Sequence, residues 1–230
     1  MTRARIAPLN SRDLVLCDFD GTISAEDTGL VVARTLRLER FFEIEERWRR
    51  GEISSRECLR EQWLTVDPSR ADFQELIANL EISRGFEDLV ALTRERGSRF
   101  AILSDGLDTY IEVTLGRLGL TGLEYRANHA VLHEHTVELQ FACPDGRCDF
   151  CGNCKTGWLF ELRPGAERTI YIGDGISDAC ASRYCEVVFA KDLLAEACRK
   201  RGQPFLPFGT LEGVVSVLRD GREAIIEGTE

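Results

Sequence analysis

The first apolar segment of the chain is a short continuous run, Asp13–Asp18, in which Leu, Val and Cys follow one another without polar alternation. A run of this length is typical of a strand that is buried on both faces of a parallel sheet. From Glu26 to about Leu80 the apolar residues are instead spaced three or four apart, which predicts helices. Breaks at Gly51 and at Asp67-Pro68 indicate four short helices and no strand in this stretch.

Beyond this helical stretch, helix-like and strand-like patterns alternate almost to the end of the chain. The predicted helices are Phe86–Arg96, Thr109–Leu118, Thr156–Leu162 and Ser177–Tyr184, the predicted strands are Arg99–Leu103, Arg168–Ile172 and Glu186–Phe189, and Leu123–Phe141 is expected to form short strands or a hairpin. Alternation of this kind predicts an α/β protein with a Rossmann-like, doubly wound parallel sheet. We expect residues 1–23 and 82–230 to form the core domain and residues 24–81 an inserted helical cap.

Polar side chains cluster where the predicted strands end, which is where α/β sheets bind their ligands. The candidates are Asp18, Asp20 and Thr22 after the first strand, Ser104, Asp105 and Gly106 after the second, Asp174 and Asp178 after the third, and Lys155 at the start of a helix. Carboxylates gathered without a cation would repel one another, and a site of few oxygen ligands suits Mg²⁺. We therefore expect a magnesium site that also binds phosphate.

These residue types together supply the parts of a phosphoryl transfer. Asp18 can attack phosphorus as a nucleophile, and Asp20 can protonate the leaving oxygen and later deprotonate water. Asp174 is the expected metal carboxylate, and Asp178 should support it from one helical turn later. Lys155 supplies a positive charge to the transferring oxygens, together with the hydroxyl and backbone N–H groups of the other candidates.

Each motif also has a purely structural interpretation. Ser104-Asp105-Gly106 is a common turn, and Gly173-Asp174-Gly175 followed by Ser177 and Asp178 could be a capped helix start. At the level of function, a phosphotransferase, a catalytically silent phosphate-binding protein and a signalling receiver domain remain alternatives to a phosphatase. A receiver domain would have no use for an acid two residues after its phosphorylated aspartate, so Asp20 argues against that alternative.

The overall composition narrows the classes of partner. Apolar residues make up 43% of the chain and charged residues 30%, which is ordinary for a globular protein. The formal net charge of −10 disfavours generic binding to nucleic acid or to an anionic membrane surface. No apolar run approaches the roughly 20 residues of a membrane span, and no secretory signal is evident at the start. We therefore expect a cytoplasmic protein whose partner is a small phosphorylated metabolite.

In their order along the chain, these motifs resemble those of the haloacid dehalogenase superfamily, and the helical insert resembles the cap of its phosphoserine phosphatase branch. The matching strings are DFDGT (Asp18–Thr22), SDG (Ser104–Gly106), Lys155 and GDGISD (Gly173–Asp178). The resemblance implies the following roles: Asp18 as nucleophile and metal ligand, Asp20 as acid/base and ligand through its carbonyl, Ser104 and Lys155 as phosphate binders, Asp174 as the metal carboxylate, and Asp178 behind it.

Within that branch, Cys151–Lys155, GDGISD and Phe189–Phe208 resemble methionine-salvage phosphatases that act on 2-hydroxy-3-keto-5-methylthiopentenyl-1-phosphate. Phosphoserine, phosphocholine and phosphoethanolamine are the alternative substrates. Phosphoserine phosphatases usually have Ser-Gly-Gly where this chain has Ser104-Asp105-Gly106. The Asp105 carboxylate would therefore lie near phosphate unless it points away.

Asp27, just after the first motif, has two interpretations. The equivalent acid in phosphoserine phosphatase is similar to a substrate contact, so Asp27 is a candidate for binding the leaving group. An acid at the start of a helix is also favoured by the helix dipole alone, without any role in substrate binding.

Nine cysteines are present, and four of them, Cys143, Cys148, Cys151 and Cys154, lie within twelve residues. Four thiolates could hold a structural Zn²⁺ and fix the loop that precedes Lys155. Reduced thiols or a labile disulfide are the alternatives. The remaining cysteines are scattered through apolar or helical stretches, which suits reduced thiols.

Overall fold

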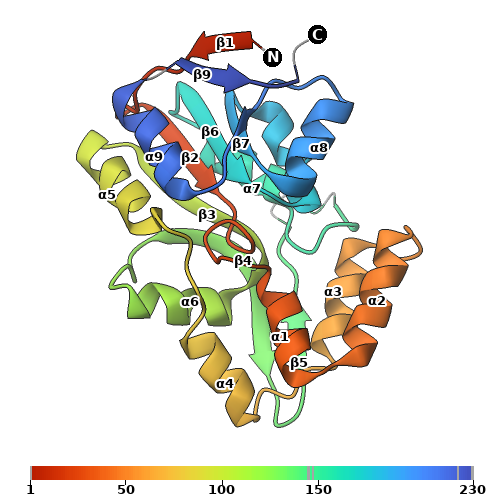
Figure 1. The fold of residues 1–230 in the computed structure, drawn as a ribbon. Helices are drawn as coiled ribbons and strands as arrows, with labels where there is room; N and C mark the ends of the chain where they lie inside the picture. Colours follow the sequence, from red (N-terminus) through yellow and green to blue (C-terminus); the bar gives the residue numbers. More distant parts are fainter. Residues whose placement is uncertain (1, 144–145, 147, 222, 229–230) are drawn as a thin grey trace.

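The computed structural model describes residues 2–143, 146, 148–221 and 223–228 (Figure 1). A seven-stranded sheet has the order β5-β4-β3-β2-β6-β7-β8. Its strands are β2 (Asp13–Cys17), β3 (Arg99–Leu107), β4 (Glu124–Leu132), β5 (Val137–Gln140), β6 (Arg168–Gly173), β7 (Val187–Ala190) and β8 (Leu206–Pro207). All neighbouring strands pair in parallel except β5, which runs antiparallel to β4. The predicted fold class is confirmed.

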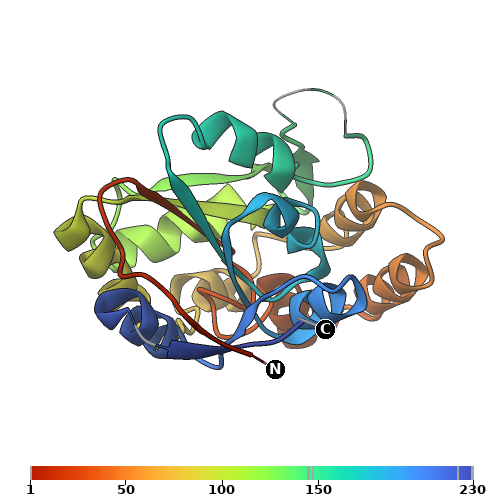
Figure 2. The same ribbon diagram turned by 90° about the horizontal axis from the view of Figure 1, so that it is seen from above.

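The central strand β2 is buried along its whole length, as its continuous apolar run predicts. Leu14 and Leu16 pack on one face of the sheet, and Val15 and Cys17 pack on the other. Helices α5 (Phe86–Arg96), α6 (Asp108–Arg117) and α9 (Leu211–Asp220) cover the Val15 face, whereas α7 (Lys155–Leu162) and α8 (Asp192–Lys200) cover the Leu14 face. Figure 2 shows α7 and α9 on opposite sides of the sheet.

Four helices follow β2, as predicted, and they lie together at the lower end of the molecule in Figure 1. They are α1 (Thr28–Leu36), α2 (Glu39–Arg49), α3 (Ser55–Trp63) and α4 (Ala71–Ala78). The two connections to this block meet at a bridge between Ser24 and Ile82, near the boundary that the sequence predicts. The division into a core domain and a cap domain stays a prediction.

Two predicted elements differ from the structure. Strand β3 continues to Leu107, so the Ser104–Gly106 motif lies inside the strand, where its register with β4 shifts. The helix predicted over Ser177–Tyr184 is wrong, because two short 3₁₀ turns occupy Ile176–Asp178 and Ala181–Tyr184. The Asp178 carboxylate accepts backbone N–H groups just before it in the chain, which favours a tight turn over a regular helix.

A two-stranded ribbon that the sequence did not predict joins β1 (Thr2–Arg5) to β9 (Glu223–Ile226). It lies at the upper end of the molecule in Figure 1, away from α1–α4. Within the described residues, every helix falls short of the length and hydropathy needed to cross a bilayer.

Candidate active site

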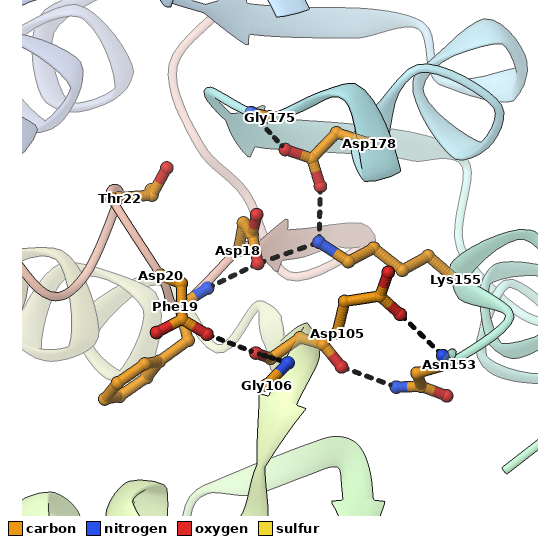
Figure 3. Close-up of polar contacts among 12 residues, drawn as sticks. Asp18, Phe19, Asp20, Thr22, Asp105, Gly106, Asn153, Lys155, Gly175 and Asp178 are labelled. Atoms are coloured by element: carbon orange, nitrogen blue, oxygen red, sulfur yellow. Dashed lines mark hydrogen bonds and ion pairs between the residues drawn. The ribbon is translucent and has the colours of Figure 1, made fainter. Parts of the chain in front are cut away.

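A buried lysine joins two of the predicted acids at the carboxyl end of the sheet (Figure 3). Asp18 directly follows β2, and Lys155 is the first residue of α7. The Lys155 Nζ lies 2.8 Å from Asp18 Oδ1 and 2.6 Å from Asp178 Oδ1. Both Lys155 and Asp18 are almost fully buried, so this charge cluster is poorly screened by solvent.

Asp178 holds this arrangement in place through both of its oxygens. Its Oδ1 accepts hydrogen bonds from Lys155 and from the Tyr171 hydroxyl at 2.7 Å, and its Oδ2 accepts the backbone N–H groups of Asp174 and Gly175 at 3.1 and 3.0 Å. Burial opposes the positive charge on Lys155, but Asp178 and Asp18 outweigh it and raise the lysine pKa. The lysine therefore remains charged at neutral pH.

Three acids could together hold a metal ion. In the part of the chain that the structure describes, Asp18, Asp174 and Asp178 are the metal-ligand group whose ligand atoms all lie within 4.8 Å of one another. Burial, followed by the charge of Asp178, raises the pKa of Asp174 to about 6 and raises that of Asp18 well above its usual range, even though Lys155 opposes the shift at Asp18. Negative charge in excess of one lysine fits a divalent cation.

The hydrogen bonds divide these acids into two kinds. Both oxygens of Asp178 already accept two donors each, so this side chain is suited to support the site. Asp174 accepts the Thr22 hydroxyl at 2.7 Å through Oδ1, and Asp18 accepts Lys155 and the Phe19 N–H through Oδ1. Asp18 and Asp174 are thus the carboxylates best placed to hold Mg²⁺.

Asp20 is held both by residues beside the sheet and by α1, the first of the helices α1–α4 that are called the cap helices below. Its Oδ2 accepts the Tyr110 hydroxyl at 2.7 Å and the Ser104 hydroxyl at 3.2 Å, and its Oδ1 accepts the N–H of Thr28 in α1 at 3.2 Å. Gly106 allows this approach, because a Cβ there would lie 1.7 Å from the Tyr110 hydroxyl and 2.2 Å from Asp20 Oδ2. A glycine at position 106 is therefore required by packing.

Asp105 points toward the loop before α7. Its Oδ1 accepts the Asn153 N–H at 2.5 Å, and its backbone carbonyl accepts the Asn128 side chain at 2.6 Å. Burial raises the pKa of Asp105, whereas Lys155 and the Asn153 N–H lower it. The contact geometry favours Asp105 as an anchor for the chain that precedes Lys155 over the predicted contact with phosphate.

A cavity of about 290 Å³ separates the acids from the cap helices. Asp18, Asp20 and Asp174 line one side, and α1, α2 and α3 line the other with mainly apolar side chains. Asp27 is also in this wall, where its Oδ1 caps α1 by accepting the Leu30 N–H at 2.8 Å. Asp27 keeps solvent-accessible surface, but desolvation by the cavity wall and the charge of Asp20 raise its pKa to about 7. The capping interpretation is confirmed, and substrate contact stays a prediction.

Comparison with known families identifies the chain. Residues 15–183 match the model of the haloacid dehalogenase-like hydrolases. The chain belongs to this family. The hydrolase is similar to a protein of Brevibacillus brevis named 2-hydroxy-3-keto-5-methylthiopentenyl-1-phosphate phosphatase, with 27% identity over 221 residues, 94% of this chain and 100% of that protein. A Bacillus pumilus protein of the same name is 28% identical over 196 residues, 83% of this chain and 84% of its own.

Solved structures share the fold of the hydrolase. A phosphoserine phosphatase in a phospho-aspartyl intermediate analogue state superimposes with a TM-score of 0.71 at 20% identity, covering 91% of this chain and 100% of that one. A hydrolase of the same family from Salmonella enterica serovar Typhi has a TM-score of 0.72 at 18% identity, covering 94% and 74% of the two chains. The predicted family resemblance is confirmed.

Four residues of the hydrolase site were missed by sequence reasoning: Tyr110, Tyr171, Asn153 and Thr28. Tyr171 had a usable signal, because a tyrosine in a buried apolar strand needs a partner for its hydroxyl. Tyr110 lies four residues after Gly106, within reach of the same sheet edge. Asn153 and Thr28 had no such signal, since their contacts depend on how separate segments pack.

Proposed function

We propose that this hydrolase is a magnesium-dependent phosphomonoesterase with Asp18 as its nucleophile. The observation that carries the proposal is the meeting of Asp18 with Lys155 at 2.8 Å, beside the carboxylate of Asp174. Lys155 places a positive charge where a phosphate oxygen would lie next to the attacking carboxylate. The hydroxyls of Thr22 and Ser104, which donate to Asp174 and Asp20 in this structure, are the proposed neutral donors to phosphate.

The first chemical step forms an aspartyl phosphate. A carboxylate oxygen of Asp18 attacks phosphorus, and the bond between phosphorus and the substrate oxygen breaks. Protonated Asp20 gives its proton to the leaving oxygen, so that a neutral alcohol or enol departs. The contacts of Asp20 with Tyr110 and Thr28 hold its carboxyl group at the cavity wall for this transfer.

The second step restores the enzyme. A water molecule attacks phosphorus and loses a proton to Asp20, while the bond between phosphorus and Asp18 breaks and inorganic phosphate leaves. Asp18 is again a carboxylate, and Asp20 is again protonated. Helices α1–α3 cover the cavity and would limit the entry of other water molecules during the cycle.

The proposed Mg²⁺ ligands are the carboxylates of Asp18 and Asp174 and the backbone carbonyl of Asp20. Asp178 supports the site by binding Lys155 and the backbone of Asp174. A bound Mg²⁺ supplies positive charge to the phosphoryl group as a Lewis acid.

The proposed substrate is 2-hydroxy-3-keto-5-methylthiopentenyl-1-phosphate, a small metabolite handled in the cytoplasm. Two observations support it: the names of relatives that match nearly the whole chain, and the apolar cap wall of the cavity. Leu30, Phe41 and Trp48 in this wall would bury the methylthio end of the leaving group.

A second candidate substrate class has a specific observation in its favour. Asp27 and Glu45 both line the cavity, and they could bind the amine of phosphoserine or phosphoethanolamine. The ratio of kcat/KM for substrates with and without an amine, measured in the wild type and in Asp27→Asn, separates the two. A ratio unchanged by the substitution removes Asp27 from substrate selection.

The test of the proposed function is a panel of phosphorylated metabolites that includes the methylthio compound, phosphoserine, phosphocholine and phosphoethanolamine. We expect the highest kcat/KM for the methylthio compound, with Mg²⁺ required and phosphate released over many turnovers. A single slow phosphorylation without turnover would instead indicate a receiver-type domain. Transfer of phosphate to an added alcohol in preference to water would indicate a phosphotransferase.

A further inference from the structure

The loop between β5 and α7 brings four thiols into one cluster. Cys148 contacts both Cys151 and Cys154, and Cys154 also contacts Cys143. These contacts link all four thiols, whereas a single disulfide would join only two of them. Among the described residues, no three of these sulfurs all lie within 4.8 Å of one another. A bound ion would draw them into a tighter group, since each Zn–S bond is about 2.3 Å long.

Backbone N–H groups are directed at the sulfurs of this cluster. The Cys151 N–H donates to Cys148 Sγ at 3.4 Å, and the Phe150 N–H also points to this sulfur. The Gly157 N–H, in the first turn of α7, donates to Cys154 in the same way. N–H donors stabilise a thiolate, and the thiolate is the form of cysteine that binds metal. Two of the four sulfurs, those of Cys148 and Cys154, thus accept backbone N–H groups.

A cationic side chain from the cap lies against this turn. Arg56 of α3 donates from Nε to the Cys151 carbonyl at 3.1 Å and from Nη2 to the Cys148 carbonyl at 3.0 Å, while its backbone N–H donates to the Phe150 carbonyl at 2.9 Å. Four thiolates around one Zn²⁺ carry a net charge of −2, which a nearby guanidinium partly offsets. Arg56 also ties the loop to α3.

The other end of the loop is tied to the active site. Asn153 donates its N–H to Asp105 and its side-chain amide to the Ser104 carbonyl at 2.8 Å, and Lys155 follows two residues later. Gly152 packs directly on the cap, because a Cβ there would lie 2.5 Å from the Leu59 side chain in α3. The loop therefore connects α3 with the lysine that contacts Asp18.

We propose that Cys143, Cys148, Cys151 and Cys154 bind one Zn²⁺, which fixes the loop joining cap helix α3 to Lys155. The role is structural, since four protein ligands leave no open position for a substrate. This second metal site is separate from the magnesium site, and it does not depend on the identity of the substrate.

The first test measures metal in the full-length protein purified without chelators. Elemental analysis should find one zinc per chain in the wild type and in Cys180→Ser, whose exposed cysteine lies outside the cluster. Cys148→Ser and Cys151→Ser should each lose most of the zinc. Wild-type protein without zinc overturns the proposal, and so does a mass lowered by the two hydrogens of a disulfide within residues 143–154.

A second test keeps the proposal falsifiable if the variants fold poorly. Co²⁺ added to the zinc-depleted wild type should produce the visible d–d bands and thiolate charge-transfer bands of a tetrahedral tetrathiolate site. Removal of zinc should also speed amide exchange in α3 and in the loop, while exchange in α9 on the far side of the core stays unchanged. Absence of thiolate bands, or equal exchange with and without zinc, contradicts the proposed role.

Discussion

The two sides of the cavity are built by different physical means. On the sheet side, hydrogen bonds hold the acids, from one at the Asp174 carboxylate to four at Asp178. On the cap side, the wall is mainly apolar, and side chains such as Leu30 and Phe41 present shape instead of directed bonds. A polar network allows one geometry, whereas an apolar wall tolerates changes of volume. The sheet side should therefore determine the chemistry and the cap side the choice of substrate.

The largest effect should come from the sheet side, at the nucleophile. Asp18→Asn removes the attacking carboxylate and should lower kcat by at least about 10⁴-fold. Steady-state phosphate release, with circular dichroism to verify folding, is the measurement. Asp88→Asn, an exposed acid in α5, should behave as wild type. Turnover that survives in Asp18→Asn would remove the nucleophilic role and with it the proposed function.

Loss of the buried positive charge of Lys155 should lower both kcat and the free energy of unfolding. Lys155→Met leaves Asp18 and Asp178 buried without their partner, which should lower the free energy of unfolding by about 3–5 kcal/mol. It should also lower kcat by about 10²–10³-fold, because a charge beside the phosphoryl group is lost. Urea unfolding and kinetics test this against Lys200→Met, an exposed lysine at the end of α8. Equal stability of the two variants would contradict the buried charge cluster.

On the cap side, truncation should alter binding more than chemistry. Leu30→Ala should raise KM about tenfold for a substrate with an apolar leaving group, with kcat nearly unchanged. Leu132→Ala, an exposed leucine at the end of β4, is the matched control and should leave KM unaltered. A fall in kcat without a rise in KM would show that the wall takes part in the chemical step, and the contrast between the two sides would fail.

The smallest effect should be a dependence of stability on pH at Asp27. The unfolded chain loses this proton near the ordinary aspartate pKa of about 4, whereas the folded chain keeps it up to about 7. Between these values the folded state binds more protons, so the free energy of unfolding falls as pH rises.

Asp27→Asn keeps a side-chain oxygen that can accept the Leu30 N–H at the start of α1, but it removes this titration. It should gain stability over wild type between about pH 5 and about pH 8, by less than about 1 kcal/mol because solvent reaches the carboxylate. The measurement is urea unfolding of both proteins at about pH 5 and at about pH 8. Parallel pH dependence of the two proteins would mean that Asp27 titrates normally.

The meeting of the candidate site residues was predictable from the sequence because each lies at the end of a strand or at the start of a helix. Asp18 and Asp20 follow a strand whose apolar run identifies it as central, and Lys155 begins a helix next to an unusual loop. Residues that follow parallel strands meet at one edge of the sheet whatever the details of packing. The helices of the cap were predictable for a similar reason, since their spacing of apolar residues is periodic.

What could not be predicted depends on contacts between distant segments. The direction of Asp105 is decided by the backbone of Asn153, and the position of Asp20 by Tyr110 in another element. The helix expected over Ser177–Tyr184 failed because the Asp178 carboxylate binds the preceding backbone. Apolar spacing within α1–α3 reveals which faces are buried, but it does not reveal how they enclose a cavity.

The ribbon of β1 and β9 has a practical consequence for handling this protein. Its two strands lie side by side at the end of the molecule opposite α2 and α3 (Figure 1). Tethering the chain to a solid support through either strand would place the attachment away from α1, α2 and α3, whose side chains line the cavity. A short peptide linker joining them would allow circular permutation, with new ends opened in a surface turn of the core.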